Sequence, residues 1–277
     1  MTDVGVDHCR VVPLDNGADP VARIQYMRHL FAYIAAAERL PPHATVLEIG
    51  TGEGYGGNLL RTRGLKLIGT DLSMQALRHA REVYTDIPFC AADGMALPFP
   101  AAMFDAIVSF QVVEHVPQVS RYLQEAGRVL KPGGLLILTT PNRDLRLLPF
   151  QMPWNPYQLR EYTARGLARA LQHHFRHVAI LGVSAKNQIL AVEKARVRQS
   201  PVRVYARMLL GWLSRERGGI RAVPAATCAA PADRLSNTDP RTPTIPQAEV
   251  EDFFLTTQTD HSLDLFAIVS QPLARLF

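Results

Sequence analysis

The sequence predicts an α/β fold in which a largely parallel sheet is covered by helices on both faces. Three observations predict it. Short apolar runs alternate with amphipathic stretches, the first run ends in a glycine-rich turn, and the alternation continues to about residue 185. Parallel strands need helical crossovers, and strands buried on both faces have continuous apolar sequences. A chain of 277 residues accommodates one large domain with an appendage.

The expected elements follow in chain order. Asp19 before Pro20 resembles an N-cap, so a helix is expected over 19–39. Apolar runs then indicate strands at 45–50, 66–71, 88–93, 104–110, 134–140 and 177–183, with helices at 74–84, 119–130 and 162–175. The sequence SLDLFAIVSQP predicts one last strand. Four units are expected: an N-terminal helical lid over 1–40, a core over 41–185, a helical and loop insertion over 186–260, and a final strand within 261–277 that completes the core.

Composition excludes several classes of protein. The hydrophobic fraction of 47% and the charged fraction of 20% are those of a globular protein. No run approaches the roughly 18 apolar residues of a membrane span, and the N-terminus lacks a signal sequence, so a cytoplasmic location is expected. Three scattered cysteines favour free thiols, and no metal site is expected. The net charge of +5 is spread along the chain, so nucleic acid is not expected as a partner.

The glycine-rich segment VLEIGTGEGYGG, residues 46–57, indicates a ligand that approaches the backbone closely. The Lys-Ser or Lys-Thr pair of a phosphate-binding P-loop is absent from it. A dinucleotide fingerprint that begins at Gly50 would need glycine at position 55, where Tyr55 stands. Glu48 would repel a pyrophosphate and suits a ligand that carries a positive amine, such as an aminoacyl sulfonium.

This segment resembles motif I of the class I S-adenosylmethionine-dependent methyltransferases, in the methyltransferase type 11-like group whose loop reads GEGYG. Asp71 lies 21 positions after Gly50, CAADGMALPFP resembles the adenine segment, and VLKPGGLLILTTPN resembles the fifth strand and its turn. The resemblance covers about residues 43–142. It implies a Rossmann-like, doubly wound mixed sheet of seven strands, the last antiparallel, with the insertion between the last two strands. It also implies S-adenosylmethionine as cofactor and S-adenosylhomocysteine as product.

The resemblance also implies roles for particular residues. The glycine loop would hold the methionine end, Asp71 the ribose hydroxyls and Asp93 the adenine amino group, with Tyr26 of the N-terminal helix closing over the cofactor. The complete set expected to bind the cofactor is Glu48, Gly50, Thr51, Gly52, Tyr55, Asp71, Leu72, Asp93, Gly94, Met95, Gln111 and Tyr26.

His115 follows the fourth strand, at the edge where open parallel sheets bind ligands. An imidazole there could deprotonate a hydroxyl, and its alternative role is to cap the loop by hydrogen bonding. Asn142, Tyr157 and Glu161 are expected to face the acceptor. The sequence WNPY at 154–157 is misplaced for methylation of nucleic-acid amines, and no cysteine follows a proline, as methylation at pyrimidine carbon 5 would require.

The expected reaction is methyl transfer to the hydroxyl oxygen of a sugar or secondary metabolite. Three alternatives remain: N- or C-methylation of a small molecule, a non-catalytic or non-methylating cofactor-binding protein, and an NAD-dependent oxidoreductase. Residues 200–217 form a basic amphipathic stretch that would suit a membrane surface. Packing of its apolar face on the domain, or on a second subunit of a homodimer, is favoured instead.

Overall fold

The computed structural model describes residues 19–148, 150–153, 155, 157–197 and 248–273. Within them an eight-stranded sheet has the order β3-β2-β1-β4-β5-β8-β6-β7. Its strands are β1 (Thr45–Ile49), β2 (Lys66–Asp71), β3 (Phe89–Ala91), β4 (Phe104–Phe110), β5 (Leu130–Pro141), β6 (Phe175–Ala185), β7 (Phe253–Thr256) and β8 (Asp264–Pro272). The helices are α1 (Pro20–Ala37), α2 (Tyr55–Thr62), α3 (Met74–Val83), α4 (Val119–Val129), α5 (Arg143–Arg146), α6 (Ala164–Gln172) and α7 (Asn187–Val197), with the 3-10 turn η4 (Val250–Asp252).

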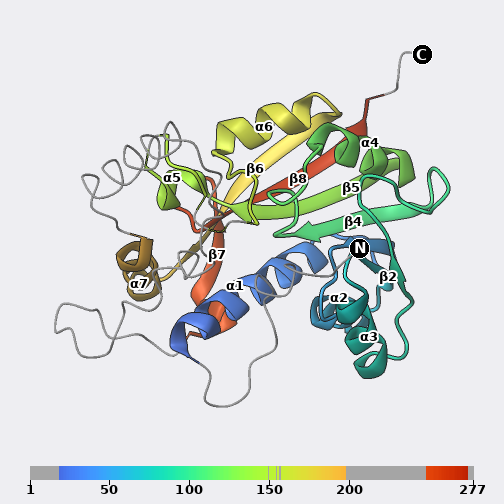
Figure 1. The fold of residues 1–277 in the computed structure, drawn as a ribbon, viewed down its shortest axis with the longest axis horizontal. Coiled ribbons are helices and arrows are strands. Elements are labelled where there is room, and N and C mark those ends of the chain that lie inside the picture. The colour runs from blue at the N-terminus through green and yellow to red at the C-terminus, as the bar shows by residue number, and fades with distance from the viewer. Residues whose placement is uncertain (1–18, 149, 154, 156, 198–247, 274–277) are drawn as a thin grey trace, which may run out of the picture.

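The first half of the sheet is parallel, as expected. β1 pairs in parallel with β2 and β4, β2 with β3, and β4 with β5. Along β1 the buried side chains alternate between two cores: Val46 packs in the core shared with α1, α2 and α3, and Leu47 in the core shared with α4 and α6. Helices therefore cover both faces of the sheet, and Figure 1 shows α4 and α6 on the side away from α1.

The second half of the sheet is antiparallel around β8, which confirms the expected orientation of the last strand. β8 lies between β5 and β6, so that Ile268 is paired with Ile137 on one side and with Ala179 on the other. The expected number of seven strands is corrected to eight, because β7 pairs with the outer edge of β6. The four residues of β7 follow a proline-rich stretch and are too short to show a periodic pattern.

Helix α1 begins where the sequence indicated. Asp19 is its N-cap and accepts a hydrogen bond from the amide of Ala22, with Pro20 in the first turn. Its other end packs against α2, and Arg23 near its start donates to the carbonyl oxygen of Ala248 at 2.8 Å. α1 therefore connects the glycine loop to the segment before β7 (Figure 1).

None of the helices among the described residues is both long and apolar enough to cross a bilayer. The amphipathic stretch at 200–217 lies outside the described residues. The proposed division into four units, and the homodimer, stay predictions.

Candidate cofactor and acceptor site

The loop after β1 is built on glycines with left-handed backbone angles. Gly50, Gly52 and Gly54 have φ of 80°, 52° and 79°, a region that side chains with a Cβ rarely adopt. The amides of Gly50 and Thr51 both donate to the carbonyl oxygen of Thr70, which fixes the loop to the end of β2. α2 begins directly after Gly54, so its free amides face the same side as the loop.

The last two glycines of the segment face the protein and not the pocket. A Cβ on Gly56 would overlap the ring of Tyr33, which comes from α1. A Cβ on Gly57 would overlap Leu67 and lie 2.6 Å from Glu48 Oε2. These two glycines therefore allow α1 and β2 to pack against α2, a role that the motif alone does not reveal.

Glu48 is buried beneath the loop and bound by the protein's own donors. The hydroxyl groups of Tyr33 and Thr51 each donate to one of its carboxyl oxygens at 2.6 Å. Burial raises the pKa of Glu48 to about 7, and these two hydrogen bonds oppose the rise. Its side chain does not line the pocket, so direct contact of Glu48 with a ligand amine stays a prediction.

A cavity of about 380 Å³ opens above the loop, at the carboxyl ends of the parallel strands. Most of the sequence-predicted residues line it: Gly50, Thr51, Gly52, Tyr55, Asp71, Leu72, Asp93, Gly94, Met95, Gln111, His115 and Tyr157. Four do not: Glu48, Tyr26, Asn142 and Glu161. The lining also includes residues that the sequence did not single out: His29, Ile49, Glu53, Ala92, Phe110, Val112, Val116, Pro117 and Tyr122.

Asp71 ends β2 with both carboxyl oxygens tied to backbone amides. Oδ2 accepts from Gly52 and Oδ1 accepts from Ser73, each at 2.8 Å. A carboxylate oxygen can accept more than one hydrogen bond, so this orientation still leaves acceptor positions for a pair of hydroxyl groups. The N-cap of α3 is Ser73, whose hydroxyl accepts from the amide of Ala76.

Asp93 marks another part of the same pocket. Its Oδ1 accepts from the amide of Met95 at 2.8 Å, which closes a tight turn around Gly94. A Cβ on Gly94 would lie 2.8 Å from two ring atoms of Tyr122, so glycine is needed for the ring to pack there. Leu72 is 68% exposed and lines the pocket, which leaves an apolar surface for a flat ring.

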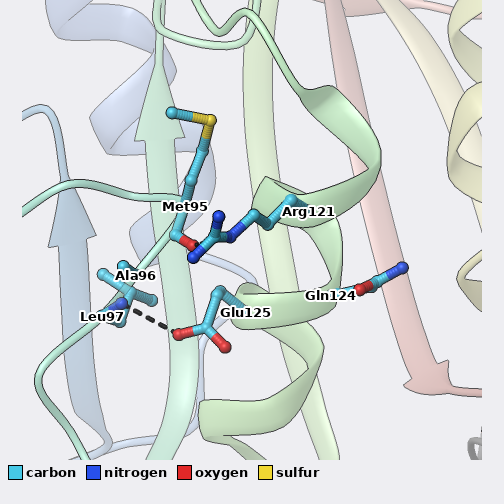
Figure 2. A pocket seen from close by; sticks show the side chains of 6 residues that line it. All are labelled: Met95, Ala96, Leu97, Arg121, Gln124 and Glu125. Atoms are coloured by element: carbon cyan, nitrogen blue, oxygen red, sulfur yellow. Dashed lines mark hydrogen bonds between the residues drawn. The ribbon is translucent and has the colours of Figure 1, made fainter.

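Met95 also borders a second, shallower pocket of about 440 Å³ on the outer side of this turn, shown in Figure 2. Two of the polar side chains that line this second pocket are hydrogen bonded to the backbone of the turn and the residues after it. Arg121 Nε donates to the carbonyl oxygen of Met95 at 2.9 Å, and Glu125 accepts from the amide of Leu97 at 2.9 Å. These contacts hold the turn of Asp93 against α4.

An aromatic wall from α1 encloses one end of the pocket above the glycine loop. His29 Nδ1 is hydrogen bonded to the hydroxyl of Tyr55, and the His29 ring lies edge-on to those of Tyr33 and Phe110. Tyr26 packs behind Tyr55, with ring centroids 5.2 Å apart. Tyr26 thus supports a lining residue and does not line the pocket itself.

The opposite wall comes from the loop after β4 and from residues 157–160. His115 Nδ1 lies 2.8 Å from the carbonyl oxygen of Tyr157, and the amide of Leu159 donates to the carbonyl oxygen of Glu114 at 2.9 Å. Arg160 donates to the carbonyl oxygen of Pro117 at 3.1 Å. Burial lowers the pKa of His115, so its imidazole is neutral over a wider pH range than a free histidine.

Two of the residues expected to face the acceptor do not line the pocket. Asn142 is fully buried; its amide nitrogen donates to the carbonyl oxygens of Thr259 and Ser262, and its oxygen accepts from the amide of Asp144. Glu161 is also buried, 3.6 Å from Arg146. Residues that follow a strand can turn either into the pocket or into the fold, and the sequence did not distinguish these directions.

The chemistry of the pocket fits an adenosyl amino acid. Carboxylates at Asp71 and Asp93, an apolar face at Leu72 and a loop with free amides match ribose, adenine and an aminoacyl group. Together with the strand order, they define a Rossmann-like domain of the S-adenosylmethionine-binding class.

Comparisons with known proteins agree with this class. Residues 47–138 match the family model described as "Methyltransferase domain". This part of the chain is a class I S-adenosylmethionine-dependent methyltransferase domain, and S-adenosylmethionine is the cofactor of that class.

Three relatives illustrate the similarity. A probable S-adenosylmethionine-dependent methyltransferase of Mycobacterium tuberculosis is 37% identical over 149 residues, which are 53% of each chain. A 2-methyl-6-phytyl-1,4-hydroquinone methyltransferase of Synechocystis is 33% identical over 138 residues, 48% of this chain and 43% of that protein. A ubiquinone biosynthesis O-methyltransferase of Chelativorans is 32% identical over 119 residues, 42% and 47%. The chain thus spans about half the length of the relatives it matches.

Solved structures share the fold over most of the chain. A methyltransferase of Thermotoga maritima described as a possible histamine N-methyltransferase has a TM-score of 0.55 at 17% identity, covering 88% of this chain and 91% of that one. The [4+2]-cyclase SpnF has a TM-score of 0.53 at 20% identity, covering 89% and 82%. The fold therefore accompanies more than one chemistry, and the activity must be argued from the site.

Proposed function

We propose that the chain is an S-adenosylmethionine-dependent methyltransferase that methylates a hydroxyl oxygen of a small-molecule acceptor, with His115 as the general base. The observation that carries this proposal is the contact of His115 Nδ1 with the carbonyl oxygen of Tyr157 at 2.8 Å. A carbonyl oxygen can only accept, so Nδ1 carries the hydrogen and Nε2 keeps its lone pair. The tautomer is thereby fixed in the form that a base requires.

When bound, S-adenosylmethionine supplies a methyl group on a positively charged sulfonium. The acceptor must then lose a proton as its oxygen forms the new bond. His115 lines the same pocket as the glycine loop, and burial keeps its imidazole neutral near pH 7. The hydroxyl proton passes to Nε2, and the segment around Tyr157 holds the ring still.

The walls beside His115 support an uncharged acceptor. Val112, Val116, Pro117 and Tyr157 are neutral, and the described lining of this pocket contains no lysine or arginine. A phosphorylated acceptor or a nucleic acid would call for such cations. Among the relatives, one name specifies an O-methyltransferase and another a hydroquinone acceptor. We therefore infer a hydroxyl on a sugar or secondary metabolite, including phenolic ones.

The test is methyl transfer from S-adenosylmethionine to a panel of glycosides, phenols and hydroquinones, followed by mass spectrometry. The expected product gains one methylene in mass, and the His115→Ala variant loses turnover while it still binds S-adenosylhomocysteine by calorimetry. Binding of NAD in place of S-adenosylhomocysteine would contradict the proposal and favour an oxidoreductase.

A further inference from the structure

Gln111, the first residue after β4, lines the pocket with a strained backbone. Its φ is 58°, in the left-handed region that residues with a Cβ rarely adopt. The sheet holds this strain, because the Gln111 amide donates to the carbonyl oxygen of Thr139 on β5 at 3.0 Å. Strained residues of this kind persist where the surrounding structure fixes them, and they gather at binding and catalytic sites.

The orientation of the Gln111 side-chain amide is set by groups inside the fold. Nε2 donates to the hydroxyl oxygen of Thr139 at 3.4 Å, and the same side chain stabilises the charged carboxylate of Asp264 at the start of β8. Asp264 is buried and lies 3.0 Å from Arg28 Nε on α1. Burial raises the pKa of Asp264, and the charge of Arg28 opposes the rise. A charged carboxylate can only accept, so Nε2 and not Oε1 faces it.

The oxygen of this amide is left for the pocket. Oε1 has no hydrogen-bond partner among the described residues, and it is not one of the buried atoms that lack a partner. An amide oxygen accepts hydrogen bonds and cannot donate them. Gln111 therefore offers the pocket a neutral acceptor, and the pair formed by Arg28 and Asp264 lies behind it.

Gln111 and His115 belong to the same turn. The amide of His115 donates to the carbonyl oxygen of Val112 at 2.9 Å, and the side chains of Gln111 and His115 both line the pocket. The reacting hydroxyl has one hydrogen, which passes to His115, so it cannot also donate to Gln111. The donor that meets Oε1 must therefore come from a neighbouring group of the acceptor.

We propose that Gln111 is a specificity-determining residue, whose amide oxygen accepts a hydrogen bond from a second hydroxyl of the acceptor, adjacent to the one that is methylated. This inference rests on the proposed O-methyl transfer and narrows its substrate class to vicinal diols, those of sugars and catechols included. An acceptor with a single hydroxyl would displace water from Oε1 and leave this atom unpaired, which disfavours it.

The test compares two pairs of ligands, catechol with phenol and cis-cyclohexane-1,2-diol with cyclohexanol, on the protein saturated with S-adenosylhomocysteine. The wild type is expected to bind the diol of a pair about tenfold more tightly, measured by nuclear magnetic resonance titration. Gln111→Met has a similar volume without the amide oxygen, so it is expected to bind both members alike. Gln118→Met, the same change at an exposed glutamine of the same loop, is the matched control and should keep the preference.

Turnover separates this inference from the function on which it rests. In Gln111→Met, kcat/KM for the diol should fall about tenfold and that for the single hydroxyl should not, with the affinity for S-adenosylhomocysteine unchanged. Equal losses for both acceptors, or no preference for either diol in the wild type, would overturn the inference. Weaker binding of S-adenosylhomocysteine in the variant would also overturn it, because Oε1 would then serve the cofactor. Preferred binding of the diol without any methylated product would overturn the proposed function and leave the inference in place.

Discussion

The hydroxyl of Tyr33 on α1 donates a hydrogen bond of 2.6 Å to Glu48 Oε1 at the end of β1. Both residues are buried, and the Tyr33 ring packs against Gly56, where a Cβ would overlap it. The N-terminal helix and the glycine loop are thus joined by a polar contact inside the fold.

Removal of this hydroxyl should destabilise the protein in a pH-dependent way. Tyr33→Phe leaves Glu48 with Thr51 as its remaining side-chain donor. The loss should be about 1–3 kcal/mol of unfolding free energy where Glu48 is charged, and smaller where it is protonated. With the pKa of Glu48 raised to about 7, urea unfolding at pH 8 and pH 5 compares the two states. Equal losses at both pH values, or no coupling to Glu48→Gln in a double-mutant cycle, would argue against the contact.

Gly56→Ala should destabilise the fold through Tyr33. The new methyl group overlaps the Tyr33 ring, and overpacking of this kind costs about 1–3 kcal/mol. The cost should be smaller in a Tyr33→Leu background, measured by thermal and urea unfolding. Gly133→Ala is the matched control: its φ is 79° and nothing lies within 4 Å of the added Cβ, so only the backbone cost of about 1 kcal/mol is expected. An equal cost in both backgrounds would show that the ring is not the cause.

The pH dependence of turnover should report His115. Because burial lowers the pKa of this imidazole below the ordinary 6.5, the base stays neutral to lower pH, and the acid limb of kcat should fall below pH 6.5. His115→Ala should reduce kcat by about 10²–10⁴-fold and remove that limb, with little change in affinity for S-adenosylhomocysteine. An unchanged limb in the variant would assign it to another group and would leave His115 with only its loop-capping contact.

Glu114→Gln should change how stability depends on pH. Burial raises the pKa of Glu114 to about 8 from an ordinary 4.5. The hydrogen bond that Thr140 donates to Glu114 lowers the pKa and so opposes part of this rise. Between these values the folded state holds a proton that the unfolded chain releases, so stability falls as pH rises, by up to about 1.4 kcal/mol per pH unit. The unfolding free energy of the variant relative to wild type should therefore rise from pH 4.5 to pH 8. Glu125→Gln is the control: Arg128 lowers the pKa of Glu125, so the same difference should fall slightly just above pH 4.5, the opposite direction, and stay flat from about pH 6 to pH 8.

The sequence predicted much of the sheet because its inner strands are apolar runs bounded by glycine and acidic residues. β2 and β4 begin and end at the expected residues, and Asp71, Asp93 and His115 line one pocket because the ends of parallel strands meet at one edge. β7 was missed because four residues carry no measurable periodicity. The insertion at 186–260 therefore contains a strand, although only helix and loop were expected.

Contacts between distant segments could not be predicted in the same way. His29 lies on a helix whose sequence indicates burial but not which partner it meets. Glu48 was expected to face a ligand, and its direction is set by Tyr33, a residue 15 positions earlier that only the folded chain brings near. The side chains of Asn142 and Glu161 point into the fold, where Asn142 donates a hydrogen bond to the carbonyl oxygen of Ser262 and Glu161 lies near the charge of Arg146.

The position of β8 has a consequence for how the chain acquires its fold during synthesis. β1 to β5 can pair as soon as residue 141 has left the ribosome, but β6 pairs with none of them and joins their sheet only when β8 enters between β5 and β6. Until then the long edge of β5 and one edge of β6 are both open to other strands. The interval between the emergence of β6 and that of β8 is therefore the one in which these two sheet edges have no partner strand.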